Sequence, residues 1–459
     1  GGDNLCNSPE SSQNDEHSVH PSISINSVKE PSIFLNAKSR TFMPLSQNGQ
    51  QRSIAVPSSL NPSCINSNFS LHIFEDAASE LTRFDTPWLV KDCSWDKEQI
   101  KKAVIWLSNE VEKPILKLTD EDYNSHGMAQ LATEKGPAYN INIDVFNQLQ
   151  HTITGWPGGK PNADDTQRPE RAEPAKKRSI IFSPHPDDDV ISMGGTFIRL
   201  VDQGHDVHVA YQTSGNTAVW DTDVLRYVEF AIDFNKSIGE DTAKLEEIYE
   251  NINTFITEKR PNDIDLREIM DVKGFIRKTE AIAGARYAGL VDENIHFMAL
   301  PFYETGKKVK SPVTEEDVKI TMELLQKVKP HQIFAAGDFA DPHGTHIVCF
   351  NIILEAMNRL RETEEWTKNC WLWMYRGAWQ EFDIHDIEMA VPLSPQEVAR
   401  KREAIFKHQS QKDTPVFPGD DEREFWVRAE ERNSETAMAY HNLGLANYEA
   451  IEAFVRWKF

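Results

Sequence analysis

Apolar and polar residues repeat with two different periods from about residue 178 onward. Ser179–Phe182 is a short apolar run of the kind that forms a buried parallel strand. Residues 190–201 repeat their apolar positions with a helical period, and Gly204 suits the turn that ends a helix. Residues 205–211 then alternate as a strand, so this stretch predicts a βαβ unit.

The same order recurs further along the chain. Residues 314–317 resemble the capped start of a helix, Pro330 stops that helix, and residues 332–336 read as the next strand. Alternating strands and helices are typical of the α/β class. We therefore predict a Rossmann-like, mostly parallel sheet flanked by helices.

The chain before this domain divides into three parts. Residues 1–72 are rich in Ser and Asn and show no sustained period, which predicts a disordered or truncated N-terminal segment. Residues 73–160 contain a clear amphipathic helix at 95–107 and predict a small helical region. Residues 161–177 have the composition of a polar linker, and the α/β domain then occupies residues 178–459.

Charge restricts the partners that the chain can have. Its 459 residues include 49 Lys and Arg against 72 Asp and Glu, a formal net charge of −23. Such a surface repels nucleic-acid and lipid phosphates, so we expect neither nucleic acid nor a membrane as a partner. No apolar run reaches the roughly 18 residues that span a bilayer, and the five cysteines are scattered without a CxxC pair. These features indicate a cytoplasmic protein.

Two polar clusters each follow a predicted strand. Residues 183–189 contain one histidine and three successive carboxylates, and residues 338–346 contain two histidines before a predicted helix at 347–360. The carboxyl ends of parallel strands meet at one edge of a sheet, so the two clusters are expected to lie together. One imidazole from each loop and a carboxylate would make the His₂-Asp set that holds catalytic Zn²⁺. The alternative for the first cluster is an acidic helix start, since Asp is a good N-cap.

Several further motifs occur in an order that resembles a known family. They are His185-Pro-Asp-Asp188, Gly194-Gly195, Thr213-Ser-Gly215, Arg277-x-x-Glu280, His343-x-x-His346 and Lys407-His-Gln-Ser-Gln411. Over residues 178–459 these motifs resemble the LmbE-like or PIG-L family of zinc N-deacetylases.

The resemblance implies a role for each matching residue. His185, Asp188 and His346 would bind Zn²⁺. Asp187 would act as the general base, and His343 would stabilise the oxyanion or serve as the acid. The implied activity is that of a zinc-dependent hydrolase that removes the N-acetyl group from an N-acetylglucosamine-type sugar or conjugate, with a small amino sugar as its substrate.

Some positions leave alternatives open. The chain has Asp189 where the family usually has Glu, and Gly344-Thr345 where it usually has Pro-Asp, and both differences concern the shape of the pocket. Arg277 would help to hold the sugar in the family. One helical turn before Glu280, however, it could equally belong to a surface ion pair.

A second resemblance concerns residues 73–160. The stretches Glu75–Arg83, Thr86–Val90 and Gln150–Pro157 are similar to the segment that joins the two halves of bacterial fused proteins. In those proteins a glucosamine-6-phosphate deaminase-like domain precedes an N-deacetylase-like one, so residues 73–160 would be the C-terminal remnant of the first domain and the linker region.

One alternative to deacetylation is therefore a deaminating sugar-phosphate isomerase. A catalytically inactive sugar-binding module is another, and the Gly344-Thr345 difference favours it. Lys307, Lys308 and Lys310 either meet a substrate phosphate or form a solvated loop. Assembly into a homo-oligomer is a further option.

Overall fold

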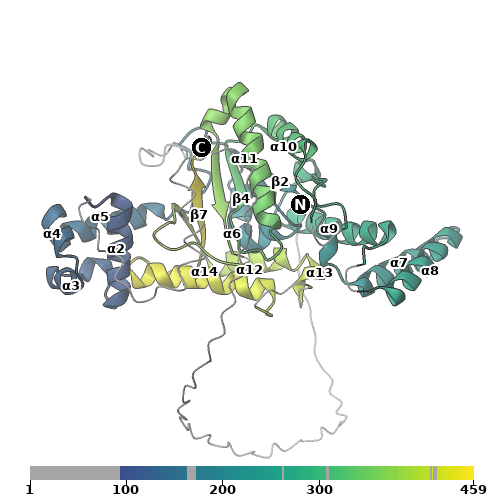
Figure 1. Ribbon diagram of the computed structural model, residues 1–459, viewed down its shortest axis with the longest axis horizontal. Helices are drawn as coiled ribbons and strands as arrows, with labels where there is room; N and C mark the ends of the chain where they lie inside the picture. Colours follow the sequence, from purple (N-terminus) through teal and green to yellow (C-terminus); the bar gives the residue numbers. More distant parts are fainter. Residues whose placement is uncertain are drawn as a thin grey trace, which may run out of the picture. The chain divides into compact units, whose positions relative to one another are not determined.

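The computed structural model of the protein describes residues 94–162, 172–260, 263–306, 310–377, 379–413, 416 and 421–459. These residues contain a seven-stranded sheet with strand order β3-β2-β1-β4-β5-β7-β6. Figure 1 shows the sheet among its helices, with β2, β4 and β7 labelled. The strands are β1 (Arg178–Ser183), β2 (Asp206–Tyr211), β3 (Ile295–Phe297), β4 (Gln332–Ala336), β5 (Trp371–Tyr375), β6 (Met389–Leu393) and β7 (Ala450–Trp457).

The first five strands of this order are parallel. β1 pairs with β2 and β4, β2 pairs with β3, and β4 pairs with β5. β7 lies antiparallel between β5 and β6 at the other edge. The predicted α/β fold with a mostly parallel sheet is therefore confirmed.

Helices connect and cover the strands. Before the sheet lie α2 (Lys97–Glu110), α3 (Asp120–Ser125), α4 (Ala129–Lys135) and α5 (Ala138–Thr152). Between the strands lie α6 (Asp188–Asp202), α7 (Asp221–Ser237), α8 (Ala243–Glu258), α9 (Arg267–Tyr287), α10 (Glu315–Val328) and α11 (Thr345–Thr363), followed by α12 (Pro395–Ile405), α13 (Gln409–Lys412) and α14 (Phe425–Asn442). Short 3₁₀ helices occupy Ile115–Lys117, Asn216–Ala218, Asp292–Asn294 and Glu365–Asn369.

Two apolar layers sandwich the sheet because side chains of a strand alternate between its faces. Ile181 of β1 packs in a core shared with α6, α9, α12 and α14. Its neighbours Ile180 and Phe182 pack in a second core with α10 and α11. Both faces of the central strands are thus buried, which explains the unbroken apolar run of β1.

The helices α2 to α5 share a third core with the end of the sheet. Leu149 of α5 packs in a cluster with Tyr440 of α14 and Ile451 of β7. Thr154 donates its backbone N–H to the carbonyl of Ala390 at 2.8 Å, next to a parallel bridge of Ile153 with the same residue. The proposed domain limits stay a prediction, because residues 1–93 and 163–171, which include the N-terminal segment and most of the linker, lie outside the described residues.

A kink divides α6 just after the first candidate site residues. Met193 leaves helical geometry, with φ −132° and ψ 26°, so the helix effectively starts again behind it. The carboxylate of Glu452 on β7 accepts the backbone N–H groups of Gly195 at 3.0 Å and Thr196 at 2.6 Å. Lys401 of α12 donates to the same carboxylate at 2.8 Å, and both side chains are 1% exposed.

The Gly194-Gly195 motif is required by this packing. A Cβ atom on Gly195 would lie 2.6 Å from the side chain of Leu393, and one on Gly194 would lie 3.0 Å from that of Lys401. The glycines therefore let α6 approach β6 and α12 closely.

None of the helices within the described ranges is both long enough and apolar enough to cross a membrane. The cytoplasmic location stays a prediction.

Candidate active site

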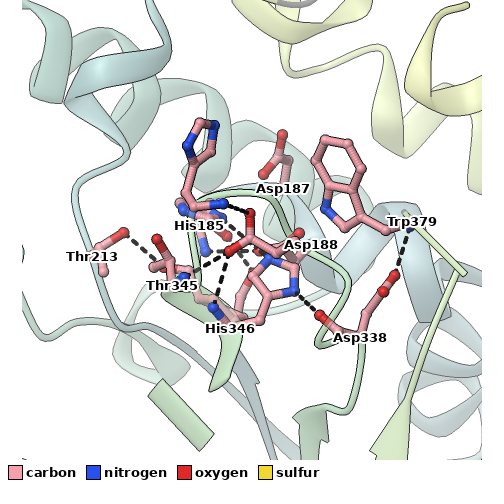
Figure 2. A network of polar contacts seen from close by, with 12 residues as sticks. His185, Asp187, Asp188, Thr213, Asp338, Thr345, His346 and Trp379 are labelled. Atoms are coloured by element: carbon pink, nitrogen blue, oxygen red, sulfur yellow. Dashed lines mark hydrogen bonds and ion pairs between the residues drawn. The ribbon is translucent and has the colours of Figure 1, made fainter. Parts of the chain in front are cut away.

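The two polar clusters meet at the carboxyl edge of the sheet, where β1 and β4 are neighbours. The side chains of His185, Asp188 and His346 offer ligand atoms that all lie within 4.8 Å of one another (Figure 2). The imidazole centroids of the two histidines are 5.3 Å apart. The loop after β1, the start of α6 and the start of α11 thus bring together the three residues expected to bind a metal.

The ring of His346 is held in a defined orientation. Its Nδ1 lies 3.0 Å from the carbonyl oxygen of Asp338, which accepts the Nδ1 proton and leaves the lone pair on Nε2. That Nε2 is buried, has no hydrogen-bond partner, and lies 3.3 Å from Oδ2 of Asp188. The carboxylate of Asp338 in turn accepts the backbone N–H groups of Trp379 at 2.6 Å and Gln380 at 3.2 Å (Figure 2).

Asp188 lies between the two histidines. Its Oδ2 accepts the backbone N–H of His185 at 2.8 Å and lies 3.2 Å from Nδ1 of the same residue. Burial by itself would raise the pKa of Asp188, but His346 and His185 hold that pKa well below its usual range. Burial likewise lowers the pKa of His346, yet the neighbouring carboxylates of Asp188 and Asp341 raise it to about 10. The negative charge of these carboxylates therefore favours a positive charge at Nε2 of His346, and a bound cation would supply it.

Asp187 is paired with Arg277 of α9. The Nη2 group of Arg277 donates to Oδ1 of Asp187 at 3.0 Å, and the two side chains are 1% and 7% exposed. Burial raises the pKa of Asp187, the charge of Arg277 opposes that shift, and the adjacent Asp188 adds to it. Asp187 is thus a buried carboxylate beside the candidate ligand set, fixed by one cation.

Asp189 points away from these residues. Its carboxylate accepts the hydroxyl protons of Ser183 at 3.2 Å and Tyr211 at 3.1 Å, and burial raises its pKa to about 7. The sequence suggested three carboxylates crowded together at one site. The structure instead separates them, because the first turn of α6 rotates Asp189 toward the protein core.

Arg277 and Glu280 do not form the surface ion pair that was one alternative. Arg277 is 1% exposed and pairs with Asp187, as described above. Glu280 is also buried and accepts both the backbone N–H and the hydroxyl of Ser410, at 2.8 and 2.6 Å. Because Ser410 belongs to the Lys407–Gln411 motif, Glu280 fixes that motif beside the cleft, which Gln411 lines.

Asp341 was not identified from the sequence as a site residue. Its carboxylate accepts the backbone N–H groups of His343 at 3.0 Å, Thr345 at 2.7 Å and His346 at 3.2 Å. It therefore caps the start of α11 and fixes the backbone that carries both histidines. An Asp a few residues before the predicted helix at 347–360 was the sequence feature that could have identified this role.

A cleft opens beside these residues. Its lining includes His185, Asp187, Asp188, Thr217, Arg277, Tyr303, Lys310, Asp341, His343, Trp379, Gln411 and Phe425. His343 is exposed on the cleft wall, whereas His346 is buried beneath it. The ammonium of Lys310 lies 3.6 Å from the ring centroid of Tyr303. Lys307 and Lys308 lie outside the described residues.

The family model described as "PIG-L: GlcNAc-PI de-N-acetylase" matches residues 180–357. This range contains all six predicted site residues: His185, Asp187, Asp188, Arg277, His343 and His346. Residues 180–357 match a PIG-L domain. The resemblance seen in the sequence is thus confirmed for this range, while the Lys407–Gln411 motif lies beyond it.

A curated relative extends past the PIG-L domain. A glucosamine-6-phosphate deaminase-like protein of Bacteroides thetaiotaomicron is 54% identical over 383 residues, which are 83% of this chain and 58% of that protein. The chain therefore spans less than two thirds of the length of this relative. The name of this relative mentions a glucosamine-6-phosphate deaminase, as does the resemblance of residues 73–160. That resemblance stays a prediction.

Solved structures that match this chain share little of its sequence. The N,N'-diacetylchitobiose deacetylase of Pyrococcus horikoshii is 19% identical, with a TM-score of 0.40, and the match covers 64% of this chain and 87% of that one. The 4-carboxy-2-hydroxymuconate hydratase of Pseudomonas putida is 16% identical, with a TM-score of 0.38, and the match covers 61% and 96%. These likenesses identify no substrate for this chain.

Proposed function

We propose that the protein is a Zn²⁺-dependent hydrolase that removes the N-acetyl group from an N-acetylglucosamine-type sugar or conjugate. The observation that carries this proposal is the convergence of His185, Asp188 and His346 beside the buried Asp187–Arg277 pair. Their position at the carboxyl edge of a parallel sheet, inside a PIG-L domain, supports it.

His185, Asp188 and His346 would hold the zinc ion. Two imidazoles and one carboxylate form the ligand set of catalytic zinc sites that keep an open position. The buried, unpartnered Nε2 of His346 fits this role, as does the carbonyl of Asp338 that orients the ring. When bound, Zn²⁺ acts as a Lewis acid that polarises an amide carbonyl and makes water more acidic.

Asp187 is the proposed general base. An amide carbon is a poor electrophile, so the attacking water must lose a proton as it adds. Arg277 holds Oδ1 of Asp187, which leaves Oδ2 outside that ion pair and free to take the proton. The side chain of Arg277 also lines the cleft, where it would help to hold the sugar.

His343 is the proposed oxyanion partner or acid. It lies on the cleft wall across the Gly344-Thr345 pair from His346, and the Asp341 carboxylate fixes its backbone N–H. From there an imidazolium would donate to the developing oxyanion or to the departing amine.

Zinc content measured beside acetate release tests these roles. Asp187→Asn should keep stoichiometric zinc and lose turnover by on the order of 10²–10⁴-fold. Asp188→Asn should lose zinc, because it removes the anionic ligand. His343→Ala should keep zinc with lowered turnover. If Asp187→Asn loses the metal while Asp188→Asn keeps it, the two carboxylates have been assigned the wrong way round.

A second cluster on the chain supplies the matched control. Asp383, His385 and Asp386 also place ligand atoms within 4.8 Å of one another, but the two carboxylates are exposed. His385→Ala should leave zinc content and acetate release unchanged, whereas His346→Ala should abolish both. Wild-type protein that holds no zinc would refute the proposal.

The name of the Bacteroides relative keeps a second candidate open. A deaminating sugar-phosphate isomerase would release ammonia from glucosamine 6-phosphate and would not need a metal. Activity that survives a chelator and the substitution His346→Ala would favour that reading over deacetylation.

A further inference from the structure

Helix α7 has apolar residues on two sides, one buried and one exposed. The inner face packs Val224, Val228 and Ile232 against α8 and α9 in a small core of their own. On the outer side lie exposed residues of α7 and its flanks, namely Trp220, Tyr227, Phe230, Phe234 and Ile238. Figure 1 shows α7 and α8 side by side. The inner face explains the fold of this hairpin, but the outer face has no role in it.

The outer residues form a single stripe. Tyr227, Phe230, Phe234 and Ile238 follow one another at intervals of three and four residues, so they lie along one side of the helix. The rings of Phe230 and Phe234 stack with centroids 6.1 Å apart. These two side chains are 66% and 53% exposed. Monomeric proteins rarely expose contiguous apolar patches larger than a few hundred Å².

The spacing of the apolar residues in the stripe is nearly symmetric about its centre. Phe230 lies near its centre, with Tyr227 three residues before it and Phe234 four residues after it. Trp220 and Ile238 lie ten residues before it and eight after it. A second α7 laid antiparallel across the first would set Phe230 on Phe230, Tyr227 against Phe234, and Trp220 against Ile238. A two-fold axis produces this arrangement, in which the same patch serves both partners.

Charges beside the stripe follow the same symmetry. Arg226 and Asp233 are seven residues apart and so share one flank of the helix. Both are exposed, and Arg226 now meets only Asp223 of its own helix, at 3.0 Å, among the ion pairs of the described residues. In the antiparallel arrangement, Arg226 of each copy would face Asp233 of the second copy, because one lies four residues before Phe230 and the other three after it. The two-fold axis would therefore form two contacts between Arg226 of one copy and Asp233 of the other.

The area is sufficient for a specific contact. A fully exposed aromatic side chain offers about 150–250 Å². Five large side chains that are about half exposed therefore present roughly 500 Å² on each copy, or about 1,000 Å² for the pair. This matches the lower limit of about 1,000 Å² for a biological interface, before the flanking polar residues are counted.

We propose that two copies of this chain associate through the outer faces of their α7 helices, antiparallel and about a two-fold axis near Phe230. This contact is independent of the proposed activity, since α7 carries none of the proposed ligands or the proposed base.

Sedimentation equilibrium of the full chain tests the proposal first. The wild-type protein should be a dimer at micromolar concentration. Phe230→Glu, which sets two carboxylates together at the axis, should raise the dimer dissociation constant by at least about tenfold. Tyr139→Glu is the matched control, because Tyr139 on α5 is 71% exposed and lies outside the stripe. The control should leave the dissociation constant unchanged.

A charge exchange tests the register. Arg226→Asp and Asp233→Arg should each weaken the dimer, because each puts like charges together twice. The double variant should recover most of the lost affinity. A double variant as weak as the single variants would contradict the antiparallel register.

Crosslinking gives a direct readout of the axis. Under a mild oxidant, Phe230→Cys should form a covalent dimer in excess over the wild-type chain, whose own cysteines make the background. The proposal is wrong if the wild-type chain is a monomer, if Phe230→Glu leaves the dimer intact, or if Phe230→Cys crosslinks no better than wild type. The stripe would then belong to another protein or to another part of this chain.

Discussion

The buried pair of Lys401 and Glu452 allows a quantitative test of how α6 is held in place. Glu452 caps the second part of the helix through the N–H groups of Gly195 and Thr196, and Lys401 neutralises it. Lys401 also donates to the side-chain oxygen of Asn433 at 2.7 Å. We consider the substitutions Glu452→Gln, Lys401→Met and their combination.

The magnitudes follow from what each substitution leaves buried. Glu452→Gln keeps an acceptor for only one of the two N–H groups, which bind separate oxygens of Glu452. It also leaves Lys401, which is 1% exposed, without a counter-charge. Removing one partner of a buried ion pair costs about 3–5 kcal/mol of unfolding free energy. Lys401→Met leaves a carboxylate that still accepts two N–H groups, so we expect a smaller loss of about 2–3 kcal/mol. The double variant has no buried charge, and its loss should fall short of the sum by at least ~2 kcal/mol.

Urea unfolding of the four proteins measures this coupling. An exposed pair of the same residue types supplies the control. Lys368 and Glu365 lie 2.6 Å apart, with side chains that are 62% and 83% exposed. The same double-mutant cycle there should give a coupling below about 1 kcal/mol.

Two results would refute the reasoning. One is a loss under about 1 kcal/mol for Glu452→Gln, which would mean that water or a local shift compensates the Lys401 charge. The other is a coupling energy equal to that of the exposed pair. In either case Glu452 would not hold the kink of α6 in the way that its contacts indicate.

Three further predictions concern other parts of the structure. Gly195→Ala should lower the free energy of unfolding by about 1–3 kcal/mol, because its Cβ would lie 2.6 Å from Leu393. Gly155→Ala has open space around it and should leave the stability unchanged, so thermal unfolding of the two variants tests this prediction. Burial and the nearby lysines lower the pKa of His205 to about 4, so the folded state keeps this ring neutral while the unfolded chain binds a proton below about pH 6.5. The stabilisation is therefore complete above pH 6.5 and is lost as the pH falls toward 4, and His205→Asn should make this loss shallower by on the order of 2 kcal/mol in unfolding experiments at several pH values. Lys310→Met should raise the KM for an N-acetylated sugar phosphate about tenfold and leave the KM for the neutral sugar unchanged, because only the phosphate loses a charged hydrogen bond. Equal effects on both substrates would argue against a role for the lysine charge.

Much of the candidate site could be predicted from local sequence. His185, Asp188 and His346 follow apolar strands, and the carboxyl ends of parallel strands collect at one edge of a sheet. Once the alternation of strands and helices was recognised, these residues had to lie near one another. The structure brings their ligand atoms within 4.8 Å.

Other contacts of the site could not be predicted, because they join elements far apart in the chain. Arg277 meets Asp187 only because α9 packs beside the loop that follows β1. The spacing of Arg277 and Glu280 suggested a partnership between them, yet Glu280 turns to Ser410 of the C-terminal motif. Spacing along a helix says which residues share a face but not what the fold places against that face.

The sequence by itself determined the class of the fold and the types of side chain at the strand ends, because both depend on periods of two and 3.6 residues and on residues close in the chain. The tertiary structure decided which carboxylates face the cleft and which one is buried in the core, since the orientation of Asp187, Asp188 and Asp189 depends on how α6 is held. The second part of α6 is held by Glu452, which lies more than 250 residues away and reaches the helix only after β7 has joined the sheet. Local periodicity carries no information about such a contact, because its partners meet only when the strands are ordered across the sheet.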